Sequence, residues 1–259
     1  MPVLPGAEPF TLGATDGSVG SVGIVLCHGF TSTPQSLRAW GEHLAAAGYP
    51  VHVPRLPGHG TRWQDLNLTR WPDWYGELER ALDRMRTRCP VVFAMGLSLG
   101  ATLALRLAEQ RGADVAGLVL VNPSLGTERR DAALLRVVSK LVPSVRGIAS
   151  DIKKPGVVEL AYDRMPLRAA ASMAQLWQVT CADLSRVTQP MLVFRSRVDH
   201  VVEPLSGRLL REGARAAHIE ERILEDSYHV ATLDNDAPAI FAGSVDFVRA
   251  HAPAVSEKQ

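Results

Sequence analysis

The sequence has few cysteines and almost no net charge. Its 259 residues include three cysteines, 28 basic residues and 27 acidic residues, so the formal net charge is +1. A chain without a basic field is a poor partner for nucleic acid, and we exclude that class of function. The cysteines Cys27, Cys89 and Cys181 are odd in number, far apart and without metal-ligand spacing. We therefore expect reduced thiols, no metal site and a cytoplasmic protein.

The sequence also lacks a long hydrophobic run. None of its apolar stretches reaches the roughly 20 residues that a membrane-spanning helix needs. The N-terminus MPVLPGAEPF has neither the basic start nor the apolar segment of a secretory signal. Apolar residues still make up 46% of the chain, enough for a large core. We expect a globular protein without a transmembrane segment, and we leave a homodimer and transient contact with lipid surfaces open.

Short apolar runs rich in valine and leucine recur along the chain. A run without alternation is buried on both faces, as in a parallel sheet. We expect strands at 22–27, 51–53, 91–95, 117–121 and 190–195, and a strand nearer the edge at 218–224. Helical patterns separate them at 34–47, 73–86, 98–110, 204–215 and 237–250. The alternation predicts an α/β protein with a mostly parallel central sheet and helices on both faces.

Residues 123–188 break this alternation. Two helical stretches, 128–145 and 166–180, follow one another there without a strand-like run between them. We interpret 123–188 as a small helical cap insertion carried above the sheet. The core would then consist of residues 1–122 and 189–259.

A single serine stands between two glycines where an apolar run meets a helical pattern. The stretch reads 91-VVFAMGLSLGATLALRLAEQ-110, and its centre fits G-x-S-x-G. In that pattern a strained strand-to-helix turn lifts the serine hydroxyl above the carboxyl end of a sheet. The flanking glycines avoid collisions across the turn. This context favours Ser98 as a nucleophile over the alternative, a glycine-rich turn whose serine only caps the helix.

A serine hydroxyl needs a general base, and the base needs an orienting acid. For a nucleophile on such a turn, the acid and then the histidine follow later in the chain. His218 lies in a strand-like segment, and His200 directly follows a candidate acid, which we expect it to cover. His229 lies in the polar loop 225–234, between the last strand and the last helix. We therefore predict His229 as the base.

The acid should follow a buried strand through a short turn. Asp199 does so, in the segment SRVDHVV after the apolar run 190–195. Asp183, Asp226 and Asp234 are alternatives, but none of them directly follows a buried strand. Asp199 is thus our predicted acid, and the alternative role for it is a local turn hydrogen bond.

The oxyanion of an acyl-transfer reaction needs two backbone donors. One should be the N–H of Leu99, directly after the nucleophile, and the other the N–H of Phe30, in the loop after an early strand. We expect Gly29 to let that loop turn and His28 to hold it by hydrogen bonds rather than to act as a base. Cys27, beside His28, is expected to pack in the core.

Together these motifs resemble the α/β-hydrolase superfamily. HGFTSTP, PRLPGHG at 54–60, GLSLG, SRVDHVV and SYHVATLD are similar to its bacterial monoacylglycerol lipases and small carboxylesterases. The stretch 149-ASDIKKPGVVELAY-162 resembles the cap of bacterial monoacylglycerol lipases. The resemblance covers about residues 22–248.

The resemblance implies Ser98, Asp199 and His229 as a catalytic triad and Phe30 and Leu99 as oxyanion donors. It also implies a small lipophilic ester, most of all a monoacylglycerol, as substrate, and a reaction without cofactor or metal. The alternatives are a general short- to medium-chain carboxylesterase, a cofactor-free haloperoxidase with the same triad, and a catalytically silent ligand-binding protein.

The cap combines apolar helical faces with polar groups, and a monoacylglycerol has the same division between tail and head. We hypothesise that Glu159 lies near the glycerol end, where a carboxylate accepts hydrogen bonds from hydroxyls. The alternative is a solvated helix charge.

Overall fold

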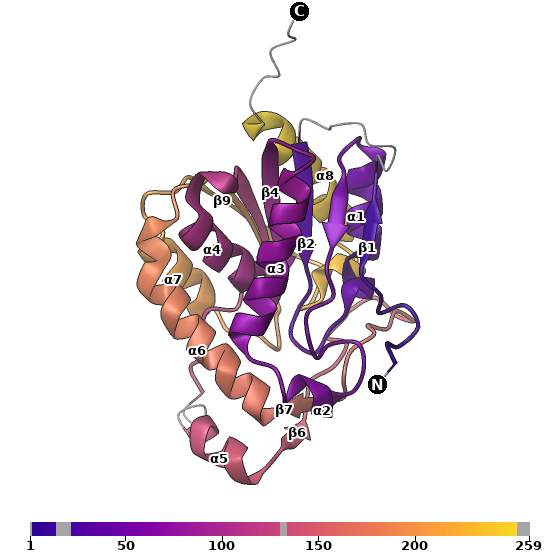
Figure 1. Cartoon of the computed structure of the whole chain (residues 1–259), viewed down its shortest axis with the longest axis vertical. Coiled ribbons are helices and arrows are strands. Elements are labelled where there is room, and N and C mark those ends of the chain that lie inside the picture. Colours follow the sequence, from indigo (N-terminus) through magenta and orange to yellow (C-terminus); the bar gives the residue numbers. More distant parts are fainter. Residues whose placement is uncertain (1, 14–21, 130–133, 253–259) are drawn as a thin grey trace, which may run out of the picture.

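Seven strands form one sheet in the computed structural model, which describes residues 2–13, 22–129 and 134–252 (Figure 1). The strand order is β1-β3-β2-β4-β5-β8-β9, and only β1 runs antiparallel to its neighbour. Every residue of β2 and β5 is buried, as expected of central parallel strands. The strands are β1 (Phe10–Leu12), β2 (Val22–Cys27), β3 (Val51–Val53), β4 (Val91–Leu97), β5 (Gly117–Val121), β8 (Met191–Ser196) and β9 (Ile219–Leu224).

Helices cover both faces of this sheet. Trp74 and Leu103, from α3 and α4, lie in the core cluster on one face, whereas Trp40 and Phe247, from α1 and α8, lie in the cluster on the other. The main helices are α1 (Arg38–Ala46), α3 (Trp71–Arg86), α4 (Leu99–Arg111), α7 (Leu205–Gly213) and α8 (Ala237–His251). The shorter ones are η1 (Pro34–Leu37), α2 (Trp63–Leu66), η2 (Gly112–Asp114) and η5 (Ala231–Leu233). The α/β prediction is confirmed.

The segment between β5 and β8 contains strands that the sequence analysis did not predict. Its elements are α5 (Leu135–Leu141), β6 (Ser144–Arg146), β7 (Arg164–Pro166), α6 (Leu167–Asp183) and η4 (Leu184–Arg186). β6 and β7 form a separate antiparallel pair, so the expectation of a purely helical insertion is wrong. The helical stretch predicted from 128 includes residues 130–133, which lie outside the described residues. The helix that is described ends two residues before Pro143.

Helix α6 runs beside α4 and α7, whereas α5, β6 and β7 lie at the lower end of the molecule in Figure 1. Ala169 and Leu176 of α6 are buried in the same cluster as α3 and α4. Asn67 fastens the start of α6, because its Oδ1 accepts from the Arg168 N–H at 3.0 Å and its Nδ2 donates to the Pro143 carbonyl at 2.7 Å. The division of the chain at 123 and 188 remains our proposal.

No helix in the described ranges is both long enough and apolar enough to cross a membrane.

Candidate active site

Ser98 stands at the junction of β4 and α4 with a backbone that serine rarely adopts. Its φ is 55° and its ψ is −115°, between the last residue of β4 and the first residue of α4. The Ser98 N–H donates to the carbonyl of Val121, at the end of the neighbouring strand β5, at 2.9 Å. The residue is 7% exposed. The strained elbow expected from the sequence is therefore present, at the carboxyl edge of the sheet.

The two glycines of the elbow leave room for close backbone contacts. A Cβ on Gly96 would collide with the backbone of Gly100, and a Cβ on Gly100 would collide with the carbonyl of Cys27 on β2. Helix α4 can therefore approach the sheet closely, which keeps Ser98 at the edge. Cys27 itself is fully buried, and burial raises the pKa of its thiol, so its predicted place in the core is confirmed.

The structure brings Asp199 and His229 together. Asp199 lies in the turn after β8, and His229 lies in the loop between β9 and α8. The Asp199 Oδ2 is 2.9 Å from the His229 Nδ1, and both side chains are 9% exposed. The other carboxylate oxygen, Oδ1, accepts from the N–H groups of Val201 and Val202, each at 2.8 Å. These two bonds leave Oδ2 free to orient the imidazole, with Nε2 as the nitrogen available for proton transfer.

Among the described residues no hydrogen bond joins the Ser98 hydroxyl to His229. Such bonds are often long without substrate and shorten when it binds. The alternative acids have other partners. Asp183 pairs with Arg106 at 2.6 Å and Asp226 with Lys153 at 2.6 Å. Asp234 accepts backbone N–H groups, including that of Lys153.

Asn122 was missed by the sequence analysis. It follows β5 with a φ of 44°, and its Nδ2 donates to the His229 carbonyl at 2.8 Å. The same amide group bonds the Ser196 hydroxyl at 3.0 Å, and its Oδ1 accepts from the Ser196 N–H at 2.8 Å. Asn122 thus ties the histidine loop to the ends of β5 and β8. Its place directly after a buried strand was the only signal in the sequence.

The loop after β2 is held by His28. The Leu56 N–H donates to its Nε2 at 3.1 Å, so its Nδ1 carries the proton and donates to the Gly29 carbonyl at 3.0 Å. Burial lowers the pKa of His28 to about 4, which keeps the ring neutral. The predicted loop-holding role of His28 is confirmed. Gly29 is not the residue with left-handed backbone, however; Thr31 is, with a φ of 62°.

Phe30 and Leu99 both belong to backbone segments near Ser98. Leu99 is the first residue of α4, so its N–H has no partner within the helix. Phe30 lies in the loop after β2, and Gly29 next to it approaches Ser98, because a Cβ on Gly29 would be 3.7 Å from the Ser98 Cβ. Both N–H groups come from backbone beside the serine.

Three carboxylates raise the pKa of His229. Burial alone would lower the pKa of its imidazole, but Asp199, Glu159 and Asp151 together raise it above its ordinary value. The pKa of Asp199 changes in the opposite direction. Burial raises it, and the contacts with His229, Val201 and Val202 outweigh burial, so the pKa falls. A charged carboxylate beside an imidazole that readily takes a proton is the arrangement of a general base.

Glu159 lies in the loop between β6 and β7. Its N–H donates to the Ser150 hydroxyl at 3.0 Å, and its side chain is close enough to His229 for their charges to interact. Burial raises the pKa of this carboxyl, while a hydrogen bond from Ser32 and the charge of His229 act against the rise. Glu159 therefore belongs to the surroundings of His229 and is not a charge on a solvated helix.

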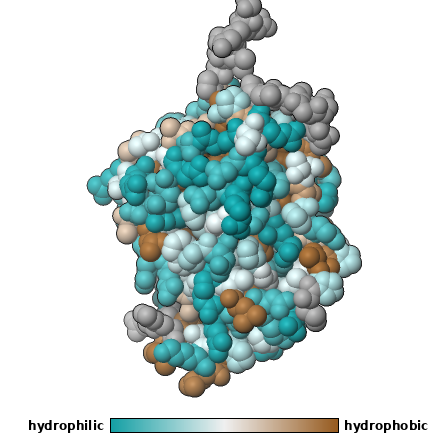
Figure 2. Space-filling model, in the orientation of Figure 1, coloured by the Kyte–Doolittle hydropathy of each residue, from teal (hydrophilic) through white to brown (hydrophobic). Residues whose placement is uncertain are grey.

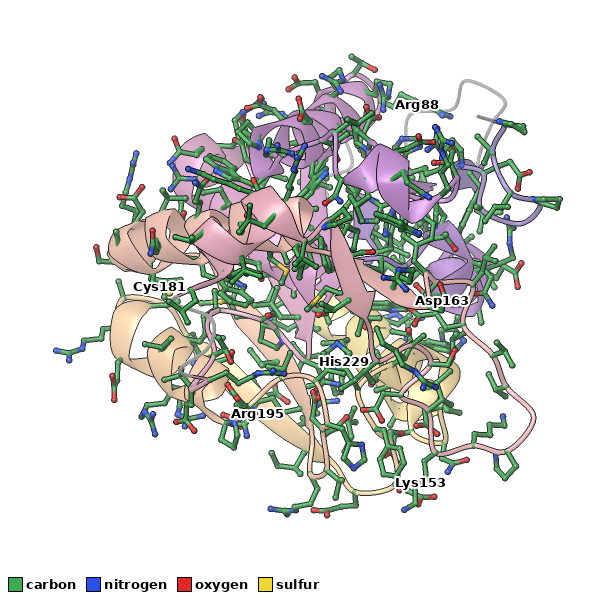
Figure 3. The ribbon with its side chains drawn as sticks, turned by 90° about the horizontal axis from the view of Figure 1, so that it is seen from below. Arg88, Lys153, Asp163, Cys181, Arg195 and His229 are labelled. Carbon is green, nitrogen blue, oxygen red and sulfur yellow. The ribbon has the colours of Figure 1, made fainter. Side chains whose placement is uncertain are left out.

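Neither a metal-binding group nor a hydrogen bond between His200 and the acid Asp199 is found among the described residues. Within the ranges that the structure describes, no group of three or more His, Cys, Asp or Glu side chains could hold a metal ion. His200, expected to cover the acid, instead turns toward Asp151, with 2.8 Å between its Nδ1 and the Asp151 Oδ1. In Figure 3, His229 lies toward the middle of the view and Lys153 near the rim.

The sequence matches the family described as Serine aminopeptidase, S33, over residues 22–236. It is 41% identical over 251 residues to a thermostable monoacylglycerol lipase of Bacillus sp. (strain H-257), an alignment that covers 97% of this chain and 98% of that protein. It is 23% identical over 247 residues to a carboxylesterase of Bacillus subtilis (strain 168), covering 93% and 96% of the two chains.

Solved structures are similar over almost the whole chain. A structure reported for LipS and LipT, two metagenome-derived lipolytic enzymes, has a TM-score of 0.91 and 39% identity, and covers 96% of this chain and 100% of that one. A monoacylglycerol lipase of Paleococcus ferrophilus has a TM-score of 0.77 and 20% identity, covering 97% and 100%. At that identity the likeness shows the fold alone.

Proposed function

Because this chain belongs to the family described as Serine aminopeptidase, S33, and has the α/β-hydrolase fold, we propose that it hydrolyses monoacylglycerols to free fatty acid and glycerol. That it is a carboxylic ester hydrolase follows from its similarity to lipolytic relatives over nearly its whole length. The resemblance noted in the sequence is thereby confirmed. The observation that carries the mechanism is the 2.9 Å contact of Asp199 with His229 at the sheet edge that bears Ser98.

The reaction proceeds in two halves. His229 Nε2 takes the proton of the Ser98 hydroxyl as Oγ attacks the ester carbonyl carbon, and the oxyanion is held by the N–H groups of Phe30 and Leu99. The intermediate then collapses, and glycerol leaves with the proton from His229. Water, deprotonated by His229, attacks the acyl carbon; the bond from that carbon to Ser98 Oγ then breaks, His229 returns the proton to Oγ, and the fatty acid leaves. Asp199 stabilises the imidazolium in both halves.

Glu159 is our proposed glycerol-reading residue. It is partly buried, accepts a hydrogen bond from Ser32 and lies close enough to His229 for their charges to interact, which supports a place for its carboxylate near the leaving alcohol. A carboxylate accepts hydrogen bonds from two hydroxyls, and the alcohol of a monoacylglycerol carries two that remain free. An alcohol without these hydroxyls offers no donor to Glu159.

We also propose that substrate is collected from a lipid surface by the cap. Its residues Val137 and Ile148 are each 61% exposed, and Leu141 is 83% exposed. Brown apolar residues gather at this lower end of the molecule in Figure 2. A homodimer through the same face is the competing arrangement. Flotation with lipid vesicles and sedimentation without them distinguish the two. The cytoplasm, inferred from the reduced cysteines, is the proposed location.

A hydrolysis panel tests the function. Monoacylglycerols of graded chain length are compared with p-nitrophenyl esters, a triacylglycerol and an amino-acid p-nitroanilide. We expect the highest kcat/KM for a monoacylglycerol and none for the anilide. Higher values for short p-nitrophenyl esters than for every monoacylglycerol would favour a general carboxylesterase, and turnover of the anilide alone would favour an aminopeptidase.

A further inference from the structure

Residues 150–154 of the cap run along the loop that bears His229. The Val230 N–H donates to the Asp151 carbonyl at 3.0 Å. Asp234, on the loop, accepts from the N–H groups of Lys153 and Lys154 at 2.7 and 2.9 Å. These contacts place the Asp151 side chain next to the catalytic loops, although more than 70 residues separate it from His229 along the chain.

The Asp151 carboxylate joins the two loops that carry the acid and the base. Its Oδ2 accepts from the His229 N–H at 3.1 Å and from the His200 N–H at 3.2 Å. Its Oδ1 is 2.8 Å from the His200 Nδ1. His200 is the residue directly after Asp199, so one carboxylate holds the backbone on both sides of the Asp199–His229 contact. Only 9% of the Asp151 side chain is exposed.

We propose that Asp151 is a positioning residue that sets the distance between Asp199 and His229 from the cap. Hydrogen bonds from backbone N–H groups to a buried carboxylate are charge-assisted and short-ranged, so they hold both loops in one relative position. A misplacement of about 1 Å in such a pair costs on the order of 100-fold in rate. This inference rests on the proposed roles of Asp199 and His229.

The charge of Asp151 gives a second, independent readout. Asp199, Glu159 and Asp151 are the carboxylates that raise the pKa of His229 against the effect of burial. Removing the charge of Asp151 at constant shape therefore lowers the pKa of His229. A carboxylate held at a distance from the imidazole would leave this pKa unchanged, so the shift checks that Asp151 lies beside His229, while the loss of kcat checks its positioning role.

The test compares Asp151→Asn and Asp151→Ala with Asp226→Asn. The control removes a carboxylate from the loop that bears His229, one that is 59% exposed and, among the described residues, forms an ion pair with the Lys153 ammonium alone. We expect Asp151→Ala to lower kcat by about 30- to 100-fold, in line with the cost of misplacement, with KM within about twofold. Both a monoacylglycerol and a p-nitrophenyl ester should show this loss. Asp151→Asn should lose less and shift the acidic limb of the pH–rate profile to lower pH. The control should match the wild type.

Titration with a fluorophosphonate gives the fraction of competent protein, and rates are expressed per competent site. This correction separates a positioning defect from poor folding. A kcat per site within twofold of wild type in both Asp151 variants would overturn the proposal, as would an effect confined to KM or an unshifted acidic limb in Asp151→Asn. Retained activity in Ser98→Ala would instead refute the proposed function, whatever the Asp151 variants do.

Discussion

The carboxylate of Asp199 divides its two oxygens between two tasks. Oδ2 meets His229 at 2.9 Å, and Oδ1 is fixed by the N–H groups of Val201 and Val202 in its own turn. The backbone of its own turn therefore fixes the Asp199 carboxylate in the position from which it orients the imidazole. The acid–base pair depends on one short turn after β8 and on the loop that reaches it from β9.

Ser98→Ala should abolish ester hydrolysis and leave the fold intact. Only oxyanion stabilisation and binding remain without the nucleophile, so kcat should fall by several orders of magnitude. Initial rates with a monoacylglycerol and labelling by a fluorophosphonate measure this, with circular dichroism as the folding control. Turnover near the wild-type level in a folded variant would refute the assignment of Ser98.

His229→Ala should be about as damaging as loss of the serine, because the triad acts as a unit. Asp199→Asn should lower kcat by about 10⁴-fold, since an amide favours the wrong imidazole tautomer. Asp226→Asn, in the same loop as His229, is the matched control. If Asp199→Asn were neutral and Asp226→Asn inactive, the acid would be wrongly assigned.

The rate should rise with pH through a pKa above the ordinary histidine value of about 6.5. Protonated His229 cannot accept the Ser98 proton, and the neighbouring carboxylates, Asp199 foremost, keep it protonated to higher pH than burial alone would. A profile of kcat/KM from pH 5 to 9 measures the midpoint. Loss of the Asp199 charge in Asp199→Asn should move the residual activity to lower pH. A wild-type midpoint below the ordinary value contradicts the electrostatic account.

Glu159→Ala should lower kcat/KM for a monoacylglycerol by about tenfold, the scale of a hydrogen bond to a charged group. A p-nitrophenyl ester of matched chain length should be almost unaffected. The comparison is made on the alkaline plateau, because Glu159 also raises the pKa of His229. Equal losses on both substrates, or no loss on either, would remove Glu159 from glycerol recognition.

Gly100→Ala should lower the free energy of unfolding by at least about 3 kcal/mol, the upper end for overpacking, because the new Cβ meets the rigid carbonyl of Cys27. Gly76→Ala is the control. A Cβ there lies 3.5 Å from the Arg80 guanidinium, and alanine within α3 should add about 1 kcal/mol. Chemical denaturation of both variants measures the difference. Similar stabilities would contradict the close packing of the elbow.

The alternating strands and helices of the central sheet could be predicted from the sequence. The strands at 22–27 and 117–121 were predicted at their observed ends, because uninterrupted apolar runs mark central strands. The three-residue strand β1 (Phe10–Leu12) was missed; it lies at the edge of the sheet beside β3, and none of its residues is buried. The β6–β7 pair also escaped. Its surroundings are fixed by distant contacts such as that of Asn67 with Pro143, which leave no local pattern.

The active-site residues likewise fall into those that the sequence predicted and those that it did not. The order Ser98, Asp199, His229 and the loop at Phe30 follow from motifs beside buried strands. Asn122 and Asp151 act through backbone groups far away in sequence. A single aspartate or asparagine in a polar loop has no spacing that announces such a contact, so only the folded chain reveals it.

The backbone of Ser98 has a consequence for the enzyme as a whole. A non-glycine residue at a φ of 55° and a ψ of −115° costs on the order of 1–3 kcal/mol, and glycine would adopt this geometry without that cost. At this one position glycine would give the more stable fold, whereas catalysis requires serine. A selection for heat resistance alone would replace the nucleophile, and its survivors would be stable and inactive.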